Sequence, residues 1–209
     1  MRLEMCLMSA VLMGMVAAAS AQAAPAEAGD LGPTLSKSHP IALSVNYTAT
    51  IGNAPPGNCG CFLLNGGSSE ELFHVWKNLA AVAQVTGSRT GNIPQSQQGL
   101  SLLTYMAGPR YSFLAAHRWT IYGQFLAGGV HGFDGYFPTD NPRSGGAANS
   151  LAFAPGGGLE IGVRKWLSIR ALEAEFLVTR LPNNVNEQQH NMRISSGIVF
   201  RFSSVRLSR

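Results

Sequence analysis

Charged residues are scarce in this sequence. Only 12% of its 209 residues are Asp, Glu, Lys or Arg, whereas 45% are apolar and 24 are glycine. Soluble domains carry about 25% charged residues, so this composition favours a lipid-facing or tightly packed protein. The formal net charge is only +4, and the basic residues stand singly along the chain. No basic stripe is present, which argues against a nucleic-acid partner.

Long apolar runs are absent after residue 20. A membrane-spanning helix needs about 18 to 20 consecutive apolar residues, so a membrane protein built from this chain has to be a β-barrel. Before that point, Arg2 precedes an apolar stretch that ends in Ala19-Ser20-Ala21. Residues 1–21 therefore predict a signal peptide for export. Residues 22–38 are rich in Ala, Pro, Gly and Ser and predict a flexible lead-in.

Cysteine is limited to three positions. Cys6 precedes the apolar stretch of the signal peptide, which argues against lipid attachment. Cys59 and Cys61 reach an oxidising compartment after export, where they either pair with each other in a disulfide or oxidise separately. No histidine or second cysteine pair lies near them in the sequence, so we expect no metal site and no cofactor.

Apolar and polar residues alternate in several stretches. Residues 41–51 follow a period of two, which is typical of a strand with one apolar face. Residues 191–202 place Met, Ile and Phe on one face and Arg193 and Arg201 on the other. In a membrane barrel the apolar face meets lipid and the polar face lines the lumen.

The remaining pattern supplies eight strands in all. We expect them at residues 41–51, 70–76, 79–89, 99–113, 118–130, 149–164, 166–180 and 191–202. Long connections (52–68, 90–98, 131–148, 181–189) alternate with short turns (77–78, 114–117, 164–165). This alternation is typical of an up-and-down membrane barrel. The prediction is an all-β fold, an eight-stranded antiparallel up-and-down transmembrane β-barrel over residues 39–202, followed by a tail at 203–209.

The predicted strand 166–180 contains a change of phase. Leu167 and Ile169 share one parity, whereas Leu172 and Phe176 share the other. A β-bulge near Ala171 would bring Ser168, Arg170, Glu173 and Glu175 all to the lumen side. Charges in so narrow a lumen have to pair with one another. The predicted lumen network consists of Arg110, Glu160, Arg170, Glu173, Glu175, Arg193 and Arg201.

Several short motifs occur in a familiar order. They are Cys59-Gly60-Cys61-Phe62 with Asn65-Gly66-Gly67, Gly108-Pro109-Arg110-Tyr111, the glycine-rich stretch 154–159, and Ile198 to Phe202. Together they resemble the small outer-membrane β-barrels related to the OmpA transmembrane domain, especially those of acidobacteria. The resemblance implies an outer-membrane barrel whose last strand carries an assembly signal, here Phe200 and Phe202. The seven residues after Phe202 are too few for a peptidoglycan-binding domain, so we expect no such tether.

These observations predict a non-catalytic integral protein of the bacterial outer membrane, a monomer with a structural or surface-recognition role. Its partners are outer-membrane lipid and the barrel-assembly machinery. One alternative is a lipid-modifying enzyme, in which His131 or His190 would meet Ser144 or Ser150 at the outer rim. The other is an exported soluble barrel of lipocalin type, whose apolar face would point inward to bind a small apolar ligand.

Overall fold

The computed structural model describes residues 41–53, 61–91, 93, 99–116, 118–134, 146–182 and 188–202. Eight strands account for nearly all of them. They are β1 (Ile41–Asn53), β2 (Cys61–Trp76), β3 (Leu79–Thr90), β4 (Leu100–Ala116), β5 (Trp119–Phe133), β6 (Ala147–Arg164), β7 (Leu167–Thr179) and β8 (Gln189–Phe202). The described residues include no helix of membrane-spanning length and apolarity.

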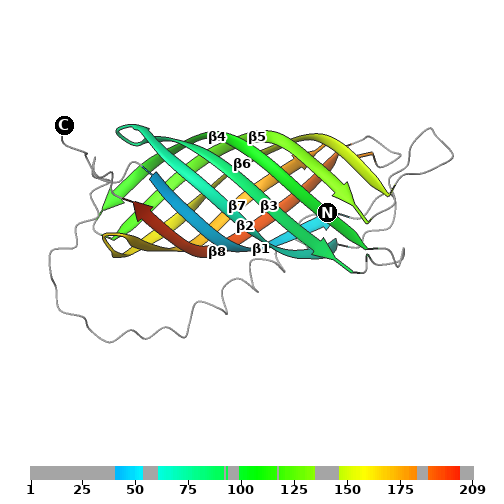
Figure 1. Cartoon of the computed structure of the whole chain (residues 1–209), viewed down its shortest axis with the longest axis horizontal. Helices are drawn as coiled ribbons and strands as arrows, with labels where there is room; N and C mark the ends of the chain where they lie inside the picture. Colours follow the sequence, from blue (N-terminus) through cyan, green and yellow to red (C-terminus); the bar gives the residue numbers. More distant parts are fainter. Residues whose placement is uncertain are drawn as a thin grey trace, which may run out of the picture. The chain divides into compact units, whose positions relative to one another are not determined.

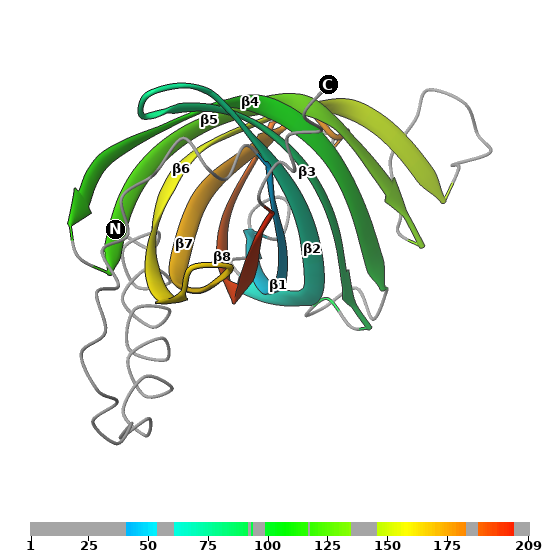
Figure 2. The same cartoon turned by 60° about the vertical axis from the view of Figure 1, so that its left-hand side comes forward.

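The strands close into one barrel (Figures 1 and 2). Each strand pairs antiparallel with the next along the chain, and β1 pairs with β8 from Ile41 opposite Phe202 to Ile51 opposite Met192. The prediction of an up-and-down, eight-stranded antiparallel barrel is confirmed. The short turns gather at one end of the barrel, the left-hand end in Figure 1, which we call the turn side. The opposite end is the loop side.

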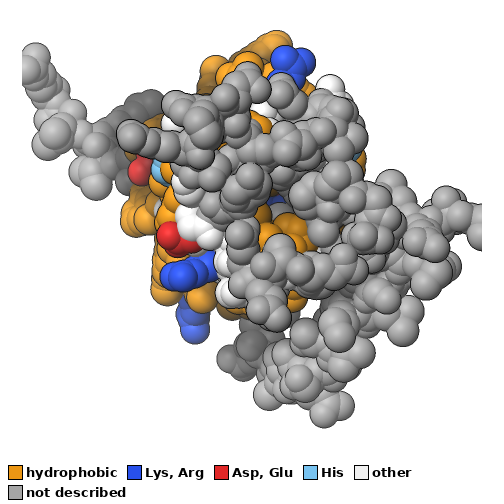
Figure 3. Space-filling model, turned by 90° about the vertical axis from the view of Figure 1, so that its right-hand side faces the viewer, with side chains coloured by type: hydrophobic (Ala, Val, Ile, Leu, Met, Phe, Trp, Pro, Cys, Tyr) orange, Lys and Arg blue, Asp and Glu red, His pale blue; other side chains and the backbone are white. Residues whose placement is uncertain are grey.

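The two faces of the wall differ sharply in chemistry. Inward positions are buried and outward positions are exposed, as in the regular alternation along β3. Large apolar side chains stand on the outside, among them Val45, Tyr105 and Phe125, each about half exposed. Figure 3, which views the barrel from its loop side, shows apolar side chains around the edge of the barrel. This is the distribution that a surrounding lipid phase stabilises.

Strand boundaries correct several sequence predictions. Residues 61–68, predicted as loop, form the first half of β2. Their Asn, Gly and Ser are weak strand formers, but Gly66 allows β2 to approach β3 closely: a Cβ there would lie 1.9 Å from the Gly87 carbonyl oxygen. The predicted turn at 114–117 is wrong over 114–116, because β4 continues to Ala116. Similarly, β5 reaches Phe133 and β6 begins at Ala147.

The phase change in β7 is a bulge at Ala171. On the β8 side the register shifts between Arg170 and Glu173, and on the β6 side the pair Leu159–Leu172 is followed directly by Glu160–Arg170. Ala171 is thus the extra residue, as the alternation predicted. The bulge brings four polar side chains of β7 to the buried face: Ser168, Arg170, Glu173 and Glu175.

Some predictions concern residues outside the described ranges. These are the signal peptide (1–21), the lead-in (22–38), Cys59, Ser144 and the tail (203–209). Cys61 begins β2, but its expected partner Cys59 lies outside the described ranges, so the Cys59–Cys61 disulfide stays a prediction.

The predicted turn at Lys77-Asn78 is present, with Lys77 in the left-handed region at φ 45°.

Candidate functional site: a charged lumen network

The turn-side half of the lumen holds eight charged side chains. Four are glutamates and four are arginines, so the cluster is formally neutral. Its members are Glu70, Arg110, Glu160, Arg170, Glu173, Glu175, Arg193 and Arg201. Seven of them are buried, and the side chain of Arg201 is 15% exposed. A group of charges removed from water in this way is stable only if every member is paired.

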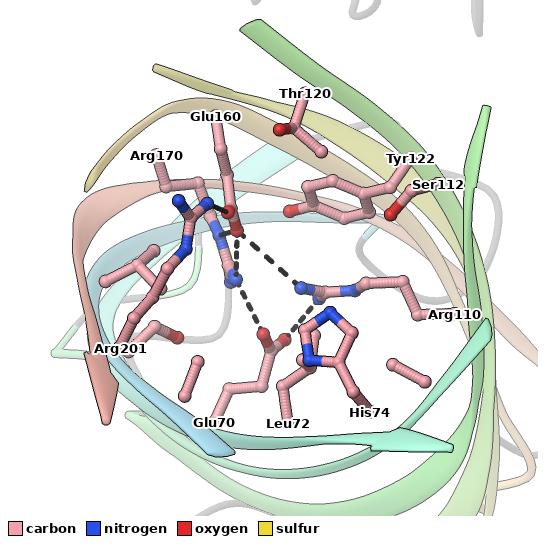
Figure 4. A pocket seen from close by; sticks show the side chains of 14 residues that line it. Glu70, Leu72, His74, Arg110, Ser112, Thr120, Tyr122, Glu160, Arg170 and Arg201 are labelled. Atoms are coloured by element: carbon pink, nitrogen blue, oxygen red, sulfur yellow. Dashed lines mark hydrogen bonds and ion pairs between the residues drawn. The ribbon is translucent and has the colours of Figure 1, made fainter. Parts of the chain in front are cut away.

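Glu70 of β2 lies at the centre of the network (Figure 4). One carboxylate oxygen accepts a hydrogen bond from Arg110 Nη2 at 2.7 Å, and the other accepts from Arg170 Nη2 at 2.6 Å. Because these arginines come from β4 and β7, the carboxylate ties three walls of the barrel together. Arg170 also reaches Glu160 Oε1 at 3.0 Å from the same nitrogen.

Glu173 lies deeper and is held from two sides. Tyr122 donates its hydroxyl to Glu173 Oε2 at 2.6 Å, and Arg110 Nη2 lies 3.3 Å from the same oxygen. The Arg110 guanidinium also stacks over the Tyr122 ring, 3.9 Å from its centroid, a cation–π contact. Gly158 makes room for this tyrosine, since a Cβ there would lie 2.5 Å from its hydroxyl oxygen. The glycine stretch of β6 thus provides space for the network.

A second group surrounds Arg193 of β8. Its Nε donates to Glu175 Oε2 at 2.7 Å, its Nη2 to Gln84 Oε1 at 2.6 Å, and its Nη1 to Thr104 Oγ1 at 3.1 Å. Gln124 joins the two groups, because it donates to Glu175 Oε1 at 2.9 Å and accepts from Arg110. The linked side chains therefore cross the lumen in several directions.

A small cavity lies beside the network toward the turn side. Its volume is about 30 Å³, and its walls include Glu70, Arg110, Tyr122, Arg170 and Arg201. That volume holds a water molecule or two and no organic ligand. Nearby in the lumen, Glu173 Oε1 and Ser168 Oγ have no hydrogen-bond partner among the described residues. We therefore assign this part of the lumen to packing and charge pairing.

The structure places all seven predicted network residues on the lumen side and joins each to an opposite charge. Within the network, Glu175 faces Arg193 directly across β7 and β8. Glu70, the central carboxylate, was missed: with residues 61–68 assigned to a loop, the phase of β2 was left open. The inward position of Glu70 was predictable from the sequence. The outward Phe73 and Val75 are spaced by two from Glu71, which places Glu71 on the outer face and Glu70 on the lumen face.

The loop-side part of the lumen contains a buried apolar cluster. It includes Leu64, Leu102, Leu126, Val130 and Leu177. Leu181, just beyond β7, is also fully buried there. Small uncharged polar side chains such as Thr50, Ser101 and Thr179 are buried in the same part of the barrel. The lumen thus changes along its length from charged groups to aliphatic and uncharged polar ones.

The candidate catalytic histidines have other contacts. His131 Nδ1 lies 2.6 Å from Asn149 Oδ1 and its ring stacks on Phe133, while His190 stacks on Phe176. Ser150 donates its hydroxyl to the Leu151 carbonyl. Within the described ranges, neither histidine pairs with Ser150. No group of three or more His, Cys, Asp or Glu suited to a metal ion occurs in that part of the chain.

Comparison with solved structures places the fold among small outer-membrane barrels. The Neisserial surface protein A superposes with a TM-score of 0.59 at 12% identity, covering 80% of this chain and 100% of that one. Ail of Yersinia pestis, in complex with the heparin analogue sucrose octasulfate, gives 0.53 at 15% identity, covering 78% of this chain and 97% of that one. No family model matches the sequence, and neither does any curated protein. The chain has the fold that the sequence resemblance implied.

Proposed function

We propose that this chain is a non-catalytic integral protein of the bacterial outer membrane, with a structural or surface-recognition role. The observation that carries the proposal is the contrast between its two faces. Outside, large apolar side chains such as Val75, Leu151 and Phe113 are 58 to 67% exposed. Inside, eight charged groups are paired with one another. Exposed apolar surface of that extent is stable in lipid and aggregates in water.

A sealed lumen supports a structural or recognition role over transport. Arg110, Arg170 and Arg193 bridge strands from opposite walls through bonds of 2.6 to 3.3 Å. An eight-stranded barrel has an interior that side chains alone fill. Any contact with external molecules then belongs to the loop side, whose longer connections are the exposed parts.

The soluble alternative is disfavoured by the same contrast. A lipocalin-type barrel keeps its apolar face inside for the ligand and a polar face toward water, and the outer wall here is apolar. The enzyme alternative lacks a histidine–serine pair in the described part of the chain.

Cell fractionation tests the proposal. Expressed with its leader, the protein should sediment with outer membranes and resist alkaline carbonate extraction. Recovery from the soluble periplasm or the medium would contradict it. Lipid A from cells with and without the protein, compared by mass spectrometry, tests the enzyme alternative, and we expect identical profiles.

A further inference from the structure

The chain's three tryptophans all adjoin its three short turns. Trp76, Trp119 and Trp166 are 67, 48 and 53% exposed on the outer wall. Each stands next to a cationic residue at its turn: Lys77, Arg118 and Lys165. The Lys77 ammonium lies 4.8 Å from the centroid of the Trp76 ring. Tryptophan is enriched at the level of lipid headgroups, so the turn side carries its cations at that level.

Two of these turns lie side by side in the barrel wall. The Arg118 carbonyl accepts a hydrogen bond from the Gly162 amide at 2.6 Å, and Trp119 pairs with Ile161 in the β5–β6 register. Arg118 therefore lies against β6 just before Arg164 and Lys165, which turn into β7. All three cations are exposed. Trp119 follows Arg118 as the first residue of β5, and Trp166 follows Lys165 just before β7.

No carboxylate in the part of the chain that the structure describes neutralises this group, which we call the Arg118–Lys165 cluster (Arg118, Arg164 and Lys165). The ion pairs formed among the described residues involve none of its three members. The exposed acid Glu71 belongs to β2, which lies across the closed barrel from β6. Glu160 is buried, and Arg170 and Arg201 bind it from inside the lumen.

We propose that the Arg118–Lys165 cluster binds the phosphate of an anionic phospholipid headgroup, with the acyl chains lying against the outer wall beside Trp119 and Trp166. Both the phosphate headgroup and the acyl chains of such a lipid match the residues present. Guanidinium groups donate several hydrogen bonds to phosphate oxygens, and the exposed Val163 and the half-buried Ile161 continue the apolar wall below the cluster. This inference rests on the proposed membrane insertion and adds a lipid selectivity to it.

Tryptophan quenching provides a local readout. The variant Trp76→Phe keeps only Trp119 and Trp166, which flank the cluster. In phosphatidylcholine bilayers, brominated phosphatidylglycerol should quench this protein at a lower mole fraction than brominated phosphatidylcholine does. Each cation near the surface contributes up to about fivefold to such a preference. Adding Arg118→Gln, Arg164→Gln and Lys165→Gln should bring the two quenching curves together.

A matched control removes cations from the loop side. Arg89→Gln with Arg180→Gln in the same Trp76→Phe background changes the net charge at the opposite end, where Arg89 faces Asp134 at 4.0 Å. It should leave the phosphatidylglycerol preference in place. High salt should abolish the preference of the parent protein, because the cluster is exposed. The salt dependence tests the lipid site in the parent protein, so it remains decisive even if the triple variant does not fold.

The possible failures are distinguishable. Absence of quenching by either brominated lipid would mean that the protein does not enter the bilayer, which contradicts the proposed function. Equal quenching by both lipids in the parent protein would overturn the lipid site alone. A preference that persists in high salt or in the triple variant would also overturn it.

Discussion

Toward the turn side of the lumen, glutamates, arginines and glutamines fill the barrel, whereas toward the loop side leucines and other aliphatic residues fill it together with small uncharged polar side chains. The charged and the aliphatic side chains stabilise the barrel through different physical effects. Each charge requires a partner at a defined distance, because an unpaired charge in a narrow lumen is costly. Aliphatic side chains require only matching volume, so they tolerate exchange for groups of similar size. The charged half therefore fixes the register of the strands, and the apolar half adds packing energy.

The largest effect should follow from deleting Ala174. Glu173 and Glu175 then become neighbours in β7, so one of them has to face lipid whether or not the bulge at Ala171 remains. We expect no folded barrel, seen as loss of the compact, heat-modifiable band on gel electrophoresis. Ala174→Gly keeps the chain length and should fold. A folded deletion variant would show that the phase of β7 does not set the lumen network.

Glu70→Gln should be the most damaging single substitution in the charged half. It leaves Arg110 and Arg170 without their shared carboxylate, and we expect a loss of about 4 kcal/mol in the free energy of unfolding. Urea unfolding in lipid vesicles measures it. The matched control is Glu71→Gln on the outer wall, which should change the free energy by less than about 0.5 kcal/mol. Equal effects of the two substitutions would contradict the central role of Glu70.

In the apolar half, Leu126→Ala should cost about 3 kcal/mol, because the side chain is fully buried and a cavity remains. Leu126→Met keeps the volume and should cost less than about 1.5 kcal/mol. The same unfolding assay compares them. If methionine were as damaging as alanine, the apolar half would be as shape-specific as the charged half.

The smallest effect is a coupling energy. Glu175 and Arg193 form the cleanest ion pair, since each has no second charged partner, whereas Arg170 contacts three glutamates. A double-mutant cycle with Glu175→Gln and Arg193→Met should give a coupling of about 2 kcal/mol. Additive effects of the two substitutions would mean that this pair does not contribute as the geometry indicates.

Alternation alone was enough to predict the strand count, seven of the eight lumen charges and the bulge, because each depends on a period of two within a single strand. It was insufficient for β2, where Gly66, Gly67 and Ser68 carry no apolar phase. Alternation also could not predict which lumen side chains contact each other. Arg110 meets Glu173 across the lumen, and such a contact follows from barrel closure and shear. The neutral partners Tyr122, Gln84 and Gln124 lacked the charge that draws attention to a lumen residue.

The pairing of β1 with β8 has a consequence for assembly. The first strand of the barrel has the last strand as one of its two neighbours. Until β8 is in place, β1 and β7 each present a full row of unpaired backbone groups, which hydrocarbon does not tolerate. A barrel that lacks β8 therefore has no stable partial form in lipid. On this argument, closure of the barrel has to wait for β8, and a variant without this strand should be degraded by proteases.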